Sequence, residues 1–312
     1  MKEKYILMAL LGGTLMMTGC DDFNVVEKEQ YKQVFAFVSD ADHFSDKMVS
    51  FDSLETTGYI SISVGGTKPT DRDIHINIAE DVNVLKDYNA QTYDVNIEKY
   101  AHLLPSYNYT IGSLQCTVKA GDIRGDVPIT IRPANLSPDT TYIVPFRISS
   151  YDYGEANPGR NYLLYRIRTR NKWCKGDGTS SYTMTASRRV VGDSTWINMP
   201  GSKVLYPIAK NIVRTMAANE DFSSNKHNLD TYGIYITIGD DNKLALTPCR
   251  DLELEQIMPN DSCYDAEYPN TYSLDNSGYV SYHTFLLHYR YKSNGEWYEI
   301  KEELRMQNTE NN

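Results

Sequence analysis

The sequence predicts an all-β protein with two antiparallel domains behind an export signal. Three observations support this prediction: apolar and polar residues alternate over many short segments, Gly, Pro, Asn and Asp bound those segments, and 25 of the 312 residues are tyrosine. Alternation at every second residue is typical of strands that bury one face, and Tyr favours such pleated, half-buried surfaces. We expect fewer than about a fifth of the residues in helices, against the usual third.

The first 19 residues are interpreted as a lipoprotein signal peptide. Lys2 and Lys4 precede an apolar run over residues 5–17, which fits a secretory signal and is too short to span a bilayer as a helix. Residues 15–20 resemble a bacterial lipobox, which implies that Cys20 is lipidated and becomes the first residue of the mature chain. Residues 20–33 would then form a polar tether. The alternative is an ordinary signal peptide with a chance cysteine.

Two acidic residues, Asp21 and Asp22, follow the expected anchor directly. They resemble the export signal that sends lipoproteins of polysaccharide-utilisation systems in gut anaerobes to the outer face of the outer membrane. The resemblance implies an outer-membrane, lipid-anchored protein that is exposed at the cell surface. Its contact with the membrane is expected through the lipid anchor alone.

Residues 34–170 are predicted to form an antiparallel β-sandwich. About seven strands are expected in this range, and Ile60, Ile62 and Val64 show the alternation most clearly. The predicted strands cover residues 34–38, 59–64, 74–78, 114–118, 127–131, 142–148 and 162–167. One interruption, over residues 79–104, is interpreted as a short helix or helical turns across the sandwich.

A second β domain is predicted over residues 171–307, followed by a short tail at 308–312. The boundary lies in the charged and then Gly/Ser/Thr-rich stretch 169–180. Hairpins are expected at residues 239–242 and 293–295, whereas residues 204–218 fit either a strand or a helix. Because meandering hairpins must hide their edges, a barrel or a jelly roll is expected.

The composition excludes several classes of function. A net charge of −10 argues against nucleic acid and against anionic lipid as electrostatic partners. The chain has no nucleophile-elbow, zinc-protease, phosphate-loop or dinucleotide motif and no CxxC or Cys/His cluster. We therefore expect no catalytic residues, no metal and no cofactor, and no enzyme activity.

Four cysteines remain besides Cys20. They are Cys116, Cys174, Cys249 and Cys263. Export permits disulfides, and four cysteines allow three pairings. Cys249 and Cys263 are the best-spaced pair, but four free thiols explain the sequence equally well.

Several segments of the first domain resemble a known family. The segments are residues 62–67, 71–74, 88–89, 102–107, 135–136 and 142–145. They are similar to the N-terminal, immunoglobulin-like domain of unknown function in surface lipoproteins of polysaccharide-utilisation loci, which also precedes the catalytic barrel of some chitinase-like endoglycosidases. Residues 173–307 resemble the β-barrel-like domain of unknown function that often follows it. The catalytic signature of the endoglycosidases is absent, and the remaining chain is too short for their eightfold barrel.

This resemblance implies a non-catalytic, outer-surface accessory of a glycan-uptake system that binds an oligo- or polysaccharide. Its expected partners are the glycan and neighbouring outer-membrane transport lipoproteins. One alternative is a structural or assembly partner of those lipoproteins that binds no sugar. Another is a glycoside hydrolase, which would need a cleft with two facing carboxylates.

Aromatic side chains in polar loops are the candidate sugar-binding residues, because sugar rings stack on aromatic planes while polar neighbours bind the hydroxyls. Trp196 lies in a polar loop-like context and is the first candidate. Trp297 lies beside a turn, and Tyr268 and Tyr272 lie in a Pro/Asn-rich segment. Trp173, at the start of the second domain, is expected to be a packing residue.

Overall fold

The computed structural model describes residues 33–66, 68–220, 226–276 and 279–308. The signal segment, Cys20, Asp21 and Asp22 lie outside these residues. Strands account for 51% of the structure and helices for 10%, which confirms the predicted all-β class. In the part of the chain that the structure describes, no helix is long and apolar enough to cross a membrane.

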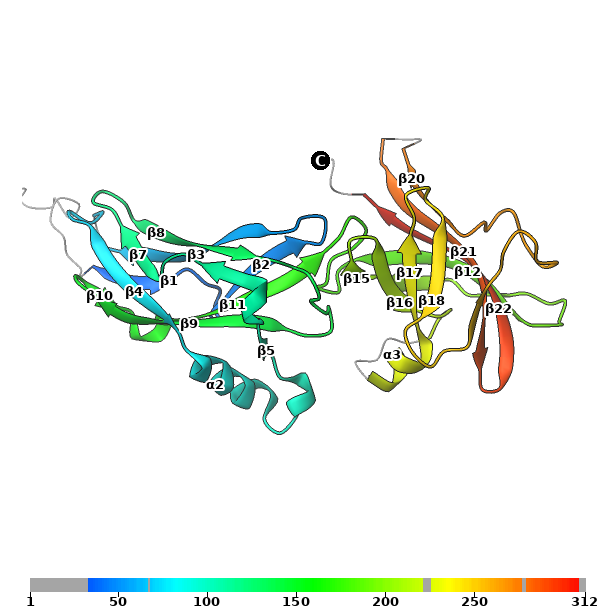
Figure 1. The fold of residues 1–312 in the computed structure, drawn as a ribbon, viewed down its shortest axis with the longest axis horizontal. Coiled ribbons are helices and arrows are strands. Elements are labelled where there is room, and N and C mark those ends of the chain that lie inside the picture. Colours follow the sequence, from blue (N-terminus) through cyan, green and yellow to red (C-terminus); the bar gives the residue numbers. More distant parts are fainter. Residues whose placement is uncertain (1–32, 67, 221–225, 277–278, 309–312) are drawn as a thin grey trace, which may run out of the picture.

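The N-terminal domain consists of two sheets packed face to face (Figure 1). The first sheet runs in the order β10 (Glu155–Ala156), β1 (Val34–Phe37), β3 (Thr56–Gly65), β8 (Arg124–Ile131) and β6 (Tyr109–Ile111). The second runs in the order β2 (Phe44–Ser50), β11 (Tyr162–Arg170), β9 (Tyr142–Tyr151), β4 (Ile74–Glu80) and β7 (Gln115–Val118), with β5 (His102–Leu103) beside β9.

The core of this sandwich comes from the predicted alternation. Ile60, Ile62 and Val64 of β3 are buried against Phe35 and Phe37 of β1 and the inward side chains of the second sheet. The pairing is not purely antiparallel, however. The chain crosses between the sheets after β1, so β2 enters beside β11 and runs parallel to it, and β1 runs parallel to β10.

The interruption in the β pattern contains helix α2 (Val82–Tyr93) and a 3₁₀ turn, η1 (Ile97–Lys99). Asp81 caps the helix, since its Oδ1 accepts a hydrogen bond from the backbone N–H of Asn83 at 3.0 Å. Val84 and Leu85 are buried against Leu164 of β11 in a small separate core. The helix is thus fixed on the outer surface of the second sheet, as Figure 1 shows.

The C-terminal domain also has two sheets. The larger contains β13 (Ile197–Asn198), β12 (Ser181–Val190), β22 (Glu296–Gln307), β21 (Tyr282–Ser293) and β19 (Leu254–Gln256), with β14 (Gly201–Val204) beside β12 and β20 (Thr271–Asp275) beside β21. The smaller contains β15 (Tyr206–Ala209), β16 (Ile212–Met216), β17 (Gly233–Ile238) and β18 (Leu244–Pro248). Helix α3 (Lys226–Tyr232) precedes β17. The ambiguous residues 204–218 are therefore mostly strand.

The two curled sheets enclose one core and approach each other at both edges. At one edge the Gln256 side chain of β19 bonds to β18: it accepts from Leu246 N at 2.9 Å and donates to Leu244 O at 2.8 Å. At the other edge the chain passes from β14 to β15 through the buried Leu205. This arrangement resembles a partly closed barrel and hides edges as expected.

Both predicted hairpin turns are present. Asn294 and Gly295 have φ angles of 51° and 86°, the left-handed conformations that a two-residue turn between β21 and β22 requires. Asn242, with φ of 62°, ends the turn between β17 and β18.

The junction between the domains is packed. The Asn171 side chain donates to the carbonyl oxygens of Ala209 and Ile212 at 2.9 and 3.1 Å. Across the junction, the buried guanidinium of Arg214 forms a two-pronged ion pair with Asp139 of the N-terminal domain. The Gly/Ser/Thr-rich stretch is therefore part of a joint rather than a loose linker.

Candidate functional site

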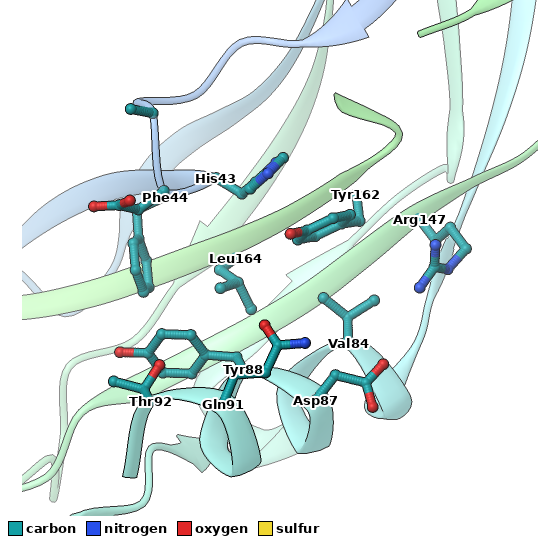
Figure 2. A pocket seen from close by; sticks show the side chains of 12 residues that line it. His43, Phe44, Val84, Asp87, Tyr88, Gln91, Thr92, Arg147, Tyr162 and Leu164 are labelled. Carbon is teal, nitrogen blue, oxygen red and sulfur yellow. The ribbon is translucent and has the colours of Figure 1, made fainter. Parts of the chain in front are cut away.

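The candidate site is a pocket of 660 Å³ in the N-terminal domain. It lies between helix α2 and the edge of the second sheet, and it is open to solvent (Figure 2). Its walls come from residues 41–44, from α2, from Arg147 of β9, and from Tyr162 and Leu164 of β11. Segments that are far apart in the sequence thus meet here.

Helix α2 contributes the polar wall. Asp87, Gln91 and Thr92 lie on its exposed side, and Figure 2 shows them along the rim that faces β11. The buried Asn89 holds the helix against the chain that follows it, because its amide exchanges two hydrogen bonds with the backbone of Ala101 at 2.8 and 2.9 Å. The polar side chains therefore project from a fixed support.

Tyr162 supplies an aromatic plane. His43 stacks on one face of the ring, with the ring centroids 4.0 Å apart and the planes 22° from parallel. The guanidinium carbon of Arg147 lies 5.8 Å from the centroid of the same ring, which also packs against the small core that contains Val84 and Leu164. His43 adopts a left-handed φ of 66°, and the Asp40 carboxylate stabilises that turn by accepting from the backbone N–H of Phe44 at 2.7 Å.

The floor of the pocket is apolar and aromatic. Leu164 and Val84 are buried, and the rings of Phe44 and Tyr88 meet edge to face at 5.3 Å. Burial raises the pKa of Tyr88 to about 12, and its neutral hydroxyl lies 3.3 Å from the hydroxyl of Tyr93. The pocket therefore combines an aromatic plane, a neutral hydroxyl and several hydrogen-bonding side chains.

The first sequence candidate, Trp196, lies in the C-terminal domain and is half-buried. The guanidinium carbon of Arg189 and the Nζ of Lys301 each lie 4.6 Å from the centroid of its ring. Both cations are themselves ion-paired, Arg189 with Glu299 and Lys301 with Asp265. This indole therefore already has two cation–π contacts within the protein.

The other candidates have different environments. Trp297 is half-buried at the start of β22, and Tyr268 is half-buried in the long connection between β19 and β20. Tyr272 is a core residue with 4% of its surface exposed; its ring meets Trp173 edge to face at 5.8 Å and its hydroxyl bonds to His283 Nδ1 at 2.8 Å. Tyr272 is therefore not a binding candidate, because it belongs to strand β20 and its side chain lies in the core of the C-terminal domain. Trp173 is buried, as expected.

A second groove, of 680 Å³, lies on the outward face of the larger C-terminal sheet. Thr183, Glu303 and Arg305 line it, together with Tyr282. The guanidinium carbon of Arg305 lies 4.1 Å from the centroid of the Tyr282 ring and Arg305 pairs with Asp275. In this domain an aromatic face is again covered by a paired cation.

Buried charges of the C-terminal domain are also paired. Lys203 Nζ lies 2.8 and 2.7 Å from the two carboxylate oxygens of Glu302, and both side chains are buried. Burial lowers the pKa of Lys203 and raises the pKa of Glu302, while the opposite charge of each partner counteracts the shift. Nearby, His288 Nε2 lies 3.0 Å from Glu299 Oε1, and burial lowers the pKa of His288 despite this carboxylate.

The possible disulfide between Cys249 and Cys263 is not formed. Cys263 accepts a hydrogen bond from Arg290 of β21, whereas Cys249 packs against Gly233 at the start of β17, so the two thiols face different strands. All four cysteines of the described chain are free thiols. Within the same residues, no group of three or more His, Cys, Asp or Glu could hold a metal ion.

Sequence reasoning did not identify the pocket. His43 is one of six histidines that are scattered along the sequence, and Tyr162 is the first residue of a predicted strand. Neither residue belongs to a recognisable motif. The one useful signal is the helical interruption over residues 79–104, because a helix laid across a sheet creates a wall beside it.

Two family models match the chain in order. One, described as an N-terminal domain, matches residues 30–154, and the other, described as a C-terminal domain, matches residues 161–305. No curated protein has a significant match to the chain.

Solved structures of Bacteroides proteins share the fold over most of the chain. A Bacteroides ovatus multidomain protein that includes the domain of unknown function DUF1735 is 18% identical, with a TM-score of 0.63 over 89% of this chain and 95% of that one. A B. ovatus protein of unknown function is 18% identical, with a TM-score of 0.64 over 88% of this chain and 95% of that one. A Bacteroides thetaiotaomicron protein described as an auxiliary nutrient binding protein is 16% identical, with a TM-score of 0.58 over 86% of this chain and 92% of that one.

The order of the two matched models and the shared fold confirm the resemblance found in the sequence. The chain belongs to the two-domain family whose N-terminal and C-terminal models match it in order and together cover most of its length.

Proposed function

We propose that the protein binds an oligo- or polysaccharide in the pocket beside α2 and does not cleave it. The observation that supports this proposal most strongly is the half-buried Tyr162 ring in the wall of a solvent-open pocket, beside a rim of hydrogen-bonding side chains. A sugar ring has an apolar C–H face and a hydroxylated edge, and the pocket offers a surface for each.

The open shape favours weak binding. An open pocket buries less of its ligand than a closed cavity, so we expect a dissociation constant in the micromolar range or weaker. This corresponds to a binding free energy no more favourable than about −8 kcal/mol. Such an affinity suits a protein that captures a glycan and passes it to a neighbouring transport lipoprotein or glycosidase. The nutrient-binding description of one similar structure supports this role.

Placement at the cell surface is part of the proposal. Cys20 would carry the lipid, and Asp21 and Asp22 would direct the protein outward, since these residues match the lipobox and the export signal. Digestion of intact cells with an added protease tests the placement. A chain that is fully protected until the outer membrane is permeabilised would contradict it.

The binding proposal predicts a specific effect of Tyr162→Ala. The substitution removes the aromatic plane, so affinity for the polysaccharide should fall by about tenfold or more, which is a loss of about 1.4 kcal/mol of binding free energy. Retention on a polysaccharide-containing native gel should fall accordingly. The measurement is affinity electrophoresis against a panel of neutral polysaccharides, with each hit quantified by isothermal titration calorimetry.

Two controls make the result specific. Tyr162→Phe keeps the plane and should retain most binding, and Tyr59→Ala removes a tyrosine that is 55% exposed elsewhere in the same domain. Melting temperatures separate lost binding from lost folding. If Tyr162→Ala melts normally and binds as well as the unmodified protein, the pocket is not the glycan site.

A further inference from the structure

The free charges at the rim of the pocket are negative. Asp42 comes from the loop before β2 and Asp87 from helix α2, and both side chains are exposed to solvent. Neither carboxylate has a hydrogen bond or an ion pair with any residue that the structure describes. Both are therefore available to a ligand, and they approach it from two different elements.

The cations near the pocket are already engaged. Arg147 Nε lies 2.7 Å from Asp81 Oδ2, and this contact lowers the pKa of Asp81. Arg166 forms two hydrogen bonds to Asp46, at 2.7 and 2.9 Å, and its guanidinium carbon lies 4.1 Å from the centroid of the Phe44 ring. Each arginine is thus balanced by a carboxylate of its own.

The remaining polar wall is uncharged. Gln91 and Thr92 each carry donors and acceptors, and no lysine lines the pocket. The whole chain adds a net charge of −10. An anionic ligand would therefore approach two unpaired carboxylates without meeting an unpaired cation among the residues that line the pocket.

We propose that this pocket selects uncharged glycans and rejects glycans that carry uronate or sulfate groups. Asp42 and Asp87 accept hydrogen bonds from sugar hydroxyls, since a carboxylate has two oxygens that can accept from neighbouring hydroxyl groups. The same carboxylates repel an acidic sugar, because like charges placed together cost binding energy. This inference rests on the proposed glycan-binding function and specifies the class of glycan.

The experiment compares each glycan with its own acidic form. The probes are a soluble α-glucan, a β-glucan, a mannan and a galactan, each before and after partial oxidation of its primary hydroxyls to carboxylates. By calorimetry at low salt, the oxidised form of a polymer that binds should have a dissociation constant about tenfold or more above that of its neutral parent. Added salt should restore part of the loss, because ions screen the repulsion, and should leave the neutral polymer unaffected.

A charge-removing variant sharpens the test. In the Asp42→Asn/Asp87→Asn protein the amides keep the shape of the carboxylates but remove the repulsion. The ratio of the dissociation constants for the oxidised and the neutral polymer should therefore shrink about fivefold or more. The control is Asp122→Asn, an exposed acid that lies outside the pocket. It should keep the full difference.

The outcomes separate the two proposals. If no polymer of either set binds, the glycan-binding function itself fails. If an oxidised polymer binds as well as its neutral parent, or if the double Asn variant keeps the full difference, the function stands and the charge selection is wrong.

Discussion

The two domains both place aromatic rings beside charged side chains, but they use the charges differently. In the C-terminal domain Arg189 and Lys301 lie over Trp196, and each is paired with a carboxylate. In the N-terminal pocket a paired cation, Arg147, also lies near the Tyr162 ring, but Asp42 and Asp87 have no partner among the described residues. The comparison teaches that a candidate site is marked by groups that the protein leaves unsatisfied, rather than by aromatic or charged residues as such.

The largest expected effect is on the buried pair of the C-terminal domain. Lys203→Ala should destabilise the protein by about 3–5 kcal/mol, because it leaves the Glu302 carboxylate buried without its counter-charge. Chemical denaturation measures this loss. The double variant Lys203→Met/Glu302→Leu should recover much of it, since apolar side chains of similar size often replace a buried ion pair.

A surface pair provides the matched control for that prediction. Lys119 pairs with Asp73 at 2.7 Å, but its side chain is 65% exposed. Lys119→Ala should therefore change the free energy of unfolding by less than about 1 kcal/mol. Similar losses in Lys119→Ala and Lys203→Ala would contradict the view that the C-terminal charges are structural.

A smaller effect is expected from pH. Burial lowers the folded-state pKa of His288 below its ordinary value of 6.5; Lys301 adds to this shift, whereas Glu299 and Asp265 oppose it without cancelling it. The unfolded chain then binds the proton more readily, so stability is full above pH 6.5 and falls as the pH drops below it. Urea unfolding at several pH values should show a steeper fall for the unmodified protein than for His288→Gln. Parallel curves would exclude His288 as the cause.

A further small effect is predicted for Trp196→Ala. Each of its two cation–π contacts contributes about 0.5–1 kcal/mol, so stability should fall by about 1–2 kcal/mol together with some loss of packing. Glycan retention should not change, in contrast to Tyr162→Ala. Loss of retention in Trp196→Ala, with an unchanged melting temperature, would move the glycan site to the C-terminal domain and reverse the comparison.

Much of the fold could be predicted because strand periodicity is local. Ile60, Ile62 and Val64 alternate in the sequence and are buried in β3, and Asn294 and Gly295 form the predicted turn. The parallel pairing of β2 with β11 could not be read in the same way, since these strands are more than 100 residues apart and their direction depends on the path between the sheets.

The pocket was harder to predict because it depends on contacts between distant segments. His43 stacks on Tyr162 only because β2 lies beside β11, and Asp87 faces them only because α2 packs on the same sheet. Tyr272 was misjudged for a related reason. A Pro/Asn-rich context suggests a loop, but the residue belongs to the short strand β20, and its ring fills a space under Trp173.

The packed junction between the domains has a mechanical consequence. Arg214 is 3% exposed and pairs with Asp139 across the boundary, so pulling the domains apart would remove the counter-charge of a buried guanidinium. Bending at the joint is therefore resisted, and the two halves should swing together as one stiff arm.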